Sequence, residues 1–133
     1  MISFVDNGDN TITDQKTRLI WQKQDDDSKR SMENALNYCE NLTLGGSSAW
    51  RLPNIKELES IVDDSKVSPS INTSYFTDTK YIPYTNYISS SHYVRDYGYI
   101  DYSWSVTFNS GEAALQDSSS NSNSYVRCVS GGQ

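Results

Sequence analysis

Short runs of alternating apolar and polar residues in the first 24 positions predict a β-meander. The runs cover residues 3–6, 11–13 and 18–23, and in the third run Leu19 and Trp21 fall on one face. The turns between them are rich in Asn, Asp and Gly, which tolerate left-handed backbone conformations. We therefore expect antiparallel strands joined by tight turns at the start of the chain.

Helical periodicity follows in residues 31–41. Four residues at spacings i, i+3, i+4 and i+7 form one apolar stripe, which we expect to be buried: Met32, Ala35, Leu36 and Cys39. The acidic run 25–27 precedes this helix. It is interpreted as a solvated loop that places negative charge near the helix N-terminus.

A second helix is expected directly after an extended segment. Pro53 restricts the residue before it to extended conformations, and Asn54 is a favourable N-cap. Glu57 lies three residues after Asn54, as in a capping box, and the apolar spacing extends the predicted helix over 54–63. Arg51 and Glu57 flank this junction. A charged hydrogen bond between strand and helix would fix the turn, so both residues are interpreted as structural.

Periodicity weakens in the second half of the chain. Residues 65–102 contain many Ser, Thr and Asn residues and predict ordered loops with short strands. Apolar residues then alternate along 103–108, a turn follows, and residues 112–116 return as a hairpin partner. Residues 125–129 are predicted to form the last strand. The large side chains expected in the core are Trp21, Trp50 and Phe108.

Composition limits the function further. The 133 residues suit one domain, residues 1–133, and the net charge of −6 makes nucleic acid, sulfated polymers and anionic lipid surfaces unfavourable partners. No apolar run approaches the roughly 20 residues that span a membrane, so no direct membrane insertion is expected. The N-terminus lacks a signal-peptide pattern. We interpret the chain as a domain of a longer protein or a processed form.

The cysteines and the histidine do not indicate catalysis. Cys39 and Cys128 leave three interpretations open: a disulfide, a reduced and buried pair, or reactive or metal-binding thiols. Two cysteines and the one histidine, His92, leave a zinc site short of ligands. The turn at 7–10 places a glycine where a calcium loop needs a ligand. We therefore expect no metal, no cofactor and no enzymatic activity.

Tyrosine is the residue type that points to a function. Eight of the ten tyrosines lie between residues 75 and 102, in the segment predicted to form loops. Tyr combines a flat apolar ring with a polar tip, which suits stacking on sugars and protein interfaces, but it also suits a core beneath loops. The candidate ligand-binding residues are Tyr93, Asp96, Tyr97, Tyr99, Asp101, Tyr102 and Trp104.

Five separated motifs occur in a recognisable order. They are Phe4–Asp14, Leu19-Ile20-Trp21-Gln22, Ala35–Cys39, Trp50-Arg51-Leu52-Pro53 with Glu57, and Tyr125-Val126-Arg127-Cys128-Val129. Together they closely resemble the Lcl C-terminal domain family, named for the tail domain of a Legionella collagen-like adhesin. The resemblance covers essentially the whole chain. It assigns the structural motif to Trp50, Arg51, Pro53, Glu57 and Arg127.

The resemblance implies an α+β, C-type-lectin-like fold related to formylglycine-generating enzymes. Such a fold has two helices packed on small antiparallel β-sheets with long irregular loops. It also implies that the helix cysteine, Cys39, pairs with Cys128 on the last strand, and that the domain is secreted, at the cell surface or periplasmic. One departure is Tyr87-Ile88-Ser89-Ser90, where the family often has Tyr-Trp-Ser-Ser. The adhesin's sulfated ligands need cations, so that ligand is not transferred to this acidic chain.

These observations predict a non-enzymatic extracytoplasmic binding or adhesion module of bacterial type. It would recognise a glycan or a protein through Tyr-rich loops, and the acidic charge favours a neutral or basic partner. The alternative is a structural or assembly domain of a larger surface protein, in which the same rings are buried between chains. The oligomeric state is left open.

Overall fold

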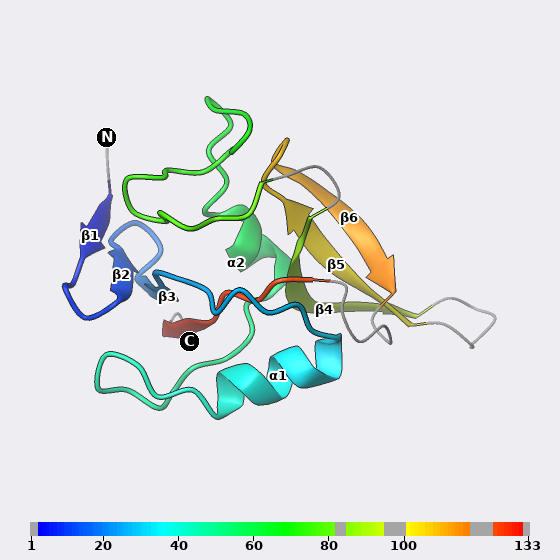
Figure 1. The fold of residues 1–133 in the computed structure, drawn as a ribbon, viewed down its shortest axis with the longest axis horizontal. Helices are drawn as coiled ribbons and strands as arrows, with labels where there is room; N and C mark the ends of the chain where they lie inside the picture. Colours follow the sequence, from blue (N-terminus) through cyan, green and yellow to red (C-terminus); the bar gives the residue numbers. More distant parts are fainter. Residues whose placement is uncertain (1–2, 82–84, 95–100, 118–123, 132–133) are drawn as a thin grey trace.

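A computed structural model describes residues 3–81, 85–94, 101–117 and 124–131 of the chain. It contains two small antiparallel sheets and two helices (Figure 1). The α+β class is therefore confirmed, and the more specific C-type-lectin-like assignment stays a prediction. No helix within the described ranges is long and apolar enough to cross a membrane.

The first sheet contains strands from both ends of the chain. Its strands are β1 (Phe4–Asp6), β2 (Thr11–Asp14), β3 (Leu19–Gln22) and β7 (Val129–Gly131), in the order β1-β2-β3-β7. All neighbours are antiparallel. The predicted meander is thus confirmed, and both termini lie at this sheet (Figure 1). The turn between β1 and β2 places Gly8 at φ 78° and Asn10 at φ 70°, the left-handed region that these residue types accept.

Helix α1 (Met32–Glu40) forms as its periodicity predicts. Ser31 is the N-cap and its side chain accepts a hydrogen bond from the Asn34 N–H. Ala35 and Cys39 are fully buried, whereas Met32 and Leu36 are half-buried. The predicted stripe therefore faces the core along its centre and reaches the surface at its edges.

Helix α2 (Ile55–Glu59) is shorter than the predicted 54–63. The N–H of Ile61 bonds to the Leu58 carbonyl three residues back, so the chain tightens into a turn after the helix. The N–H of Asp63 then bonds to the Ser70 carbonyl, so the chain no longer continues the helix at this point. Ile61 is still buried, and for this reason the apolar spacing alone made the helix look longer.

The second sheet corrects the prediction of loops with only short strands before residue 103. Its strands are β4 (Tyr87–Val94), β5 (Asp101–Thr107) and β6 (Glu112–Asp117), in the order β4-β5-β6. Tyr87 and Ile88 are both buried although they point to opposite faces of β4. A strand covered on both faces shows no alternation of apolar and polar residues. The register also shifts between Ile88 and His92, which weakens the pattern further.

The end of the chain also differs from its prediction. Residues 125–129 do not form one strand, because they pair with three different neighbours in turn. Tyr125 bridges β4, the Cys128 carbonyl accepts from the Gln22 N–H, and Val129 begins β7 while also pairing with Arg51. The final segment therefore links the two sheets instead of lengthening one of them.

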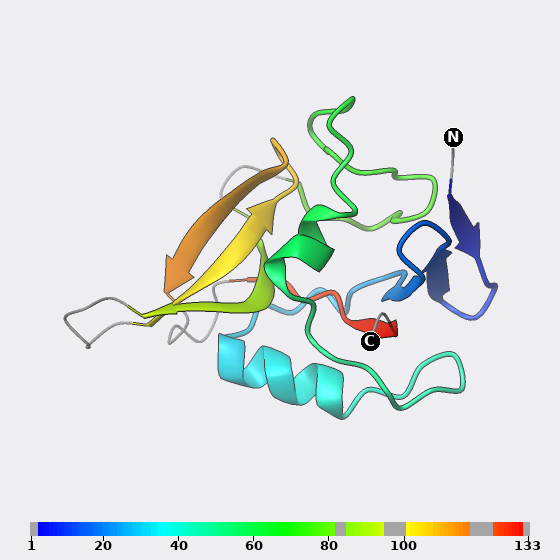
Figure 2. The same cartoon turned by 180° about the vertical axis from the view of Figure 1, so that it is seen from behind.

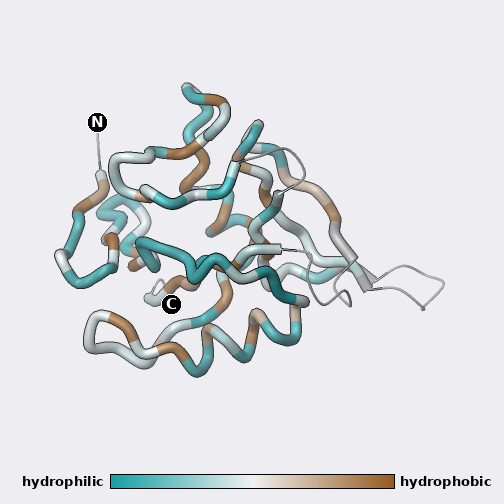
Figure 3. The backbone as a smooth tube through the Cα atoms, in the orientation of Figure 1, coloured by the Kyte–Doolittle hydropathy of each residue, from teal (hydrophilic) through white to brown (hydrophobic). Residues whose placement is uncertain are grey.

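Two apolar clusters occupy opposite sides of β4. The larger one includes Trp21, Leu58, Phe76, Tyr87 and Phe108, and the smaller one includes Cys39, Trp50, Ile88 and Cys128. Trp21, Trp50 and Phe108 are buried as predicted. Helix α2 lies between the two sheets, as Figure 2 shows from behind. Stretches of hydrophobic residues are short and lie dispersed along the backbone in Figure 3, consistent with a mean hydropathy of −0.68.

Candidate functional site

An aromatic face on the second sheet runs from the core to the surface. We define it by the side chains on one face of β4–β6, namely Tyr87, Tyr102, Trp104, Val106 and Leu115, together with Phe108, which follows β5 and contacts the Tyr87 ring. Alternate residues of a strand share a face, and the register places Val106 beside Tyr87 and Trp104 beside Leu115. Tyr87, Val106 and Phe108 are fully buried, whereas Tyr102, Trp104 and Leu115 are half-buried. Ring surface thus continues outward beyond the core.

Only part of the predicted ligand site lies in the described structure. Tyr102 and Trp104 are two residues apart on β5 and belong to the same face. Tyr93 pairs with Tyr102 in the β4–β5 register, and Asp101 pairs with Val94, but the side chains of Tyr93 and Asp101 are outside the described part. The other three candidates lie outside the described residues altogether: Asp96, Tyr97 and Tyr99.

Ser91 has a structural partner. Its hydroxyl accepts a hydrogen bond of 2.9 Å from the Ile55 N–H at the start of α2. Helix N-termini have N–H groups without partners in the helix, and Ser91 satisfies one of them. His92 is exposed on β4 opposite Ser103. The serine next to His92 therefore anchors the start of α2.

The junction before α2 has the predicted charged contact. The Arg51 guanidinium donates two hydrogen bonds of 2.7 Å to the Glu57 carboxylate and a third, also 2.7 Å, to the Gly131 carbonyl. The capping box between Asn54 and Glu57 is complete. Burial alone would raise the pKa of Glu57, but the bonds from Arg51 and from the Asn54 N–H outweigh it and lower the pKa. The predicted contact between Arg51 and Glu57 is therefore present, and the purely structural role of the two residues stays a prediction.

Arg127 belongs to a buried network that the sequence did not reveal. We call Asp25, Asp78, Lys80, Tyr87 and Arg127 the charge cluster. The Arg127 side chain is fully buried and donates to the backbone carbonyls of Gln22 and Lys23. Its second terminal nitrogen lies 3.2 Å from both Asp78 Oδ1 and Thr79 Oγ1. One guanidinium therefore joins β3 to the 78–80 segment.

Asp25 lies at the centre of the charge cluster, and the interpretation of 25–27 as a wholly solvated loop is wrong. The Asp25 side chain is 1% exposed. It accepts hydrogen bonds from the Tyr87 hydroxyl and from Lys80 Nζ, the latter at 3.0 Å. Burial and the negative charge of Asp25 raise the pKa of Tyr87, although the positive charge of Arg127 acts in the opposite direction. The members of the charge cluster are distant from one another in the sequence, so no local pattern predicts their contacts. The one local sign was a charged residue, Arg127, between the apolar residues Val126 and Cys128.

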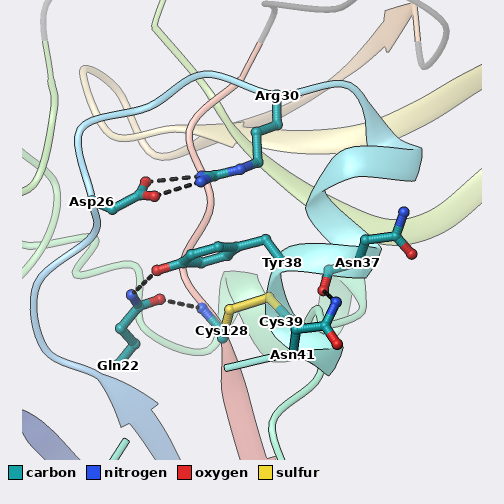
Figure 4. The surroundings of a disulfide bond; sticks show 8 residues. All are labelled: Gln22, Asp26, Arg30, Asn37, Tyr38, Cys39, Asn41 and Cys128. Carbon is teal, nitrogen blue, oxygen red and sulfur yellow. Dashed lines mark hydrogen bonds and ion pairs between the residues drawn. A yellow bond between two sulfur atoms is a disulfide. The ribbon is translucent and has the colours of Figure 1, made fainter. Parts of the chain in front are cut away.

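A polar groove lies along the outer side of α1. It is open, about 510 Å³ in volume, and is lined by Arg30, Asn34, Asn37, Tyr38, Asn41, Leu42 and Thr43. Arg30 lies 4.0 Å above the Tyr38 ring and pairs with Asp26, as Figure 4 shows. The Tyr38 hydroxyl accepts a hydrogen bond from the side-chain amide of Gln22 (Nε2). The oxygen of the same amide (Oε1) accepts one from the Cys128 N–H. The aromatic ring of this groove is therefore engaged by the protein's own residues.

Both cysteines are in one disulfide. Cys39 of α1 is bonded to Cys128, 89 residues later, and the two Cα atoms are 5.6 Å apart (Figure 4). Of the three interpretations, the disulfide is confirmed. No group of three or more His, Cys, Asp or Glu side chains in the described residues could hold a metal ion. The described chemistry is thus that of a cross-linked scaffold with an aromatic face and a polar groove.

The sequence profile of the Lcl C-terminal domain matches residues 10–130. No curated protein and no solved structure matches the chain significantly. The match covers nearly the whole chain and includes the junction, the disulfide and the charge cluster. The chain belongs to the Lcl C-terminal domain family.

Proposed function

We propose that this domain is a non-enzymatic binding module of a bacterial surface protein, and that it recognises a glycan or a protein through the aromatic face. The family suggests a domain of a surface protein. The disulfide favours an extracytoplasmic location, because disulfides persist in oxidising compartments. The net charge of −6 favours a neutral or basic ligand over a sulfated one.

One observation carries the choice of surface. Tyr102 and Trp104 are half-buried on the same face of β5, with Leu115 beside Trp104 on β6. Rings held partly by a core and partly at the surface offer a flat apolar area with little loss of conformational freedom on binding. The buried clusters on both sides of β4 and the disulfide hold this face on a rigid support.

A direct test uses tyrosine variants with a matched control. Tyr93→Ala and Tyr102→Ala are compared with Tyr81→Ala, which removes an exposed tyrosine outside β4–β6. The variants are applied to an array of neutral, amino and sulfated saccharides and to immobilised matrix proteins. The first two should lose at least about tenfold in affinity, as interface aromatics commonly do, and the control should not. Equal binding by all three would remove the proposal.

The assembly alternative is separated from binding by sedimentation. If the rings pack between copies of the chain, association should rise with concentration and should disappear in Tyr102→Ala. A monomer at all concentrations that still binds its ligand would leave the binding module as the better proposal. The C-type-lectin-like fold belongs to the same proposal. It is supported by the pairing of the last strand, β7, with β3 of the N-terminal meander and by the helix-to-last-segment disulfide, and an experimental structure superposed on lectin folds tests it.

A further inference from the structure

A cleft of about 640 Å³ lies between the first sheet and the segment that follows α2. Its lining comes from the start of β1, the end of β2 with the turn after it, and residues 60–63, together with Lys66 and Asn72. Volumes of several hundred Å³ are typical of small-ligand sites. None of the lining residues belongs to the aromatic face or to the charge cluster, so neither of these features accounts for the cleft.

Part of the cleft lining is apolar and is held by the core. Phe4 is half-buried, and its ring centroid lies 5.5 Å from that of Tyr75 and 5.3 Å from that of Phe76. Ile61 is buried and Val62 is half-buried. Because Phe4 packs on two other rings, the part of its ring that reaches the cleft is held in place. Such a ring suits the apolar C–H face of a sugar.

Asp14 brings a buried carboxylate to the cleft. The residue is 3% exposed, and its Oδ1 accepts hydrogen bonds from the Ser3 hydroxyl at 3.3 Å and from the Lys16 N–H at 2.9 Å. In the described part of the chain, no cation forms an ion pair with Asp14 and no donor reaches its Oδ2. A buried acceptor needs a donor from water or from a ligand. Asp14 therefore favours a ligand that donates hydrogen bonds.

The cleft also presents donors. The ammonium groups of Lys16 and Lys66 make no hydrogen bond and no ion pair within the described ranges. The side-chain oxygen of Asn72 accepts from the Ser74 N–H at 3.0 Å, which leaves the amide NH2 to face other partners. A hydroxyl group both donates and accepts, so it can bond to the carboxylate and to these donors alike.

The charges that line the cleft balance. Two carboxylates, Asp14 and Asp63, accompany two ammonium groups, Lys16 and Lys66. Hydrogen bonds from Ser65 and the positive charge of Lys66 lower the pKa of Asp63, so this carboxylate is ionised at neutral pH. An anion or a cation would meet groups of its own sign here. A neutral ligand with several hydroxyls meets no like charge and has a partner for each group.

We propose that this cleft binds a neutral saccharide, with a sugar ring packed against Phe4 and its hydroxyls bonded to Asp14, Lys16 and Asn72. The site lies on the first sheet and shares no residue with the aromatic face. It is therefore a second binding site, and its existence does not depend on the ligand proposed for Tyr102 and Trp104.

Nuclear magnetic resonance with sugar probes tests the position and the ligand class. The probes are lactose, maltose, cellobiose and N,N′-diacetylchitobiose, added to the whole chain labelled with nitrogen-15. At least one should shift the backbone amides of residues 14–17 and 60–63. The amino and the sulfated derivatives of the sugar that binds should bind more weakly, because each meets a like charge. Absence of shifts at these amides with all four probes, or tighter binding of a charged derivative, would overturn the proposal.

Matched variants test the two charged partners. Asp14→Asn keeps one oxygen for the Ser3 and Lys16 bonds and replaces the other by a donor. Its control is Asp64→Asn, an exposed position outside the cleft lining. Lys16→Gln is compared with Lys56→Gln, an exposed lysine of α2 that also lies outside this lining.

Each cleft variant should weaken binding of the sugar about tenfold, as the loss of a charged hydrogen bond does, and each control should leave it unchanged. Thermal melts show whether Asp14→Asn is folded; Lys16→Gln changes an exposed turn residue and keeps the test valid if it is not. Equal binding by cleft variants and controls would overturn the proposal. Loss of the sugar in Tyr102→Ala with no loss in the cleft variants would place it on the aromatic face instead.

Discussion

Two arginines hold this molecule together in different ways. Arg51 contacts Glu57 six positions away at the start of α2, and its side chain is 30% exposed. Arg127 is fully buried and contacts Gln22 and Asp78, which are 105 and 49 positions away. The first contact belongs to a local motif of cap and turn. The second exists only after the two sheets, the 25–30 loop and the 78–80 segment have come together.

The difference teaches where a charged contact matters most. A partly exposed ion pair gains little, because water solvates both groups when they separate. Water does not reach the partners of a buried guanidinium. Removing the guanidinium therefore leaves those carbonyls and carboxylates without hydrogen-bond partners. We therefore expect the charge cluster to contribute more to stability than the Arg51–Glu57 junction, although only the junction was visible in the sequence.

Arg127→Met should have the largest effect. It removes the donor to the backbone carbonyls of Gln22 and Lys23. It also leaves the negative charges of Asp25 and Asp78 with less positive charge nearby. The free energy of unfolding should fall by about 3–5 kcal/mol in urea titrations. Arg51→Met is the control and should cost clearly less. Equal losses in the two variants would contradict the ranking.

Removal of the disulfide should come next. The Cys39→Ser/Cys128→Ser variant opens a cross-link between residues 89 positions apart, with an expected loss of about 3 kcal/mol. Because Cys128 follows Arg127 directly, amide hydrogen exchange should accelerate around the charge cluster before it does around Arg51. Uniform acceleration over both regions would show that the cross-link does not act on the cluster in particular.

Tyr87→Phe tests the centre of the charge cluster. The variant keeps the ring but removes the hydroxyl that donates to Asp25 and accepts from the Lys80 N–H. Unfolding free energy should drop by about 1–3 kcal/mol, since a buried carboxylate and a backbone donor lose one partner each. Tyr125→Phe is a suitable control, because that ring is only partly buried. Thermal melts of the two variants provide the comparison.

Glu57→Gln should have a smaller effect on the junction. The amide keeps a polar group near Arg51 and the Asn54 N–H, but it loses the charge that both hydrogen bonds use. We expect a loss of about 1 kcal/mol, measured by urea titration at pH 7. A loss as large as that of Arg127→Met would mean that the junction, not the charge cluster, dominates the fold.

The smallest expected effects concern the pH dependence of stability. The junction should determine it on the acid side and the charge cluster on the alkaline side. The pKa of Glu57 lies below its ordinary value of 4.5, so its contribution is present above that pH and is lost as the pH falls through the lowered pKa. The pKa of Tyr87 lies above 10.0, so its contribution is complete below pH 10 and is lost at higher pH. Glu57→Gln should flatten the acid side of the stability profile, and Tyr87→Phe the alkaline side. The reverse assignment would contradict the structure.

Much of the fold was accessible from local pattern. The meander, the apolar stripe of α1 and the capping box at Asn54 each depend on residues within a few positions of one another. The Arg51–Glu57 contact has the same origin. The candidate site was accessible only in part. Tyr102 and Trp104 share a face because β5 begins at Asp101, whereas the apolar alternation predicted a strand only from residue 103. The pairing of Tyr93 with Tyr102 depends on a register shift in β4 that no local signal marks.

The sequence by itself determined the elements whose causes are short-range, and through its family resemblance it indicated the cysteine pairing. The tertiary structure decided three other matters: that Asp25 is buried beside Tyr87, that β4 is covered on both faces, and that the last segment divides its pairing among three neighbours. The physical reason is the same in each case. Burial and long-range pairing depend on which surfaces meet, and residues 22, 78, 87 and 127 meet only once the chain has folded.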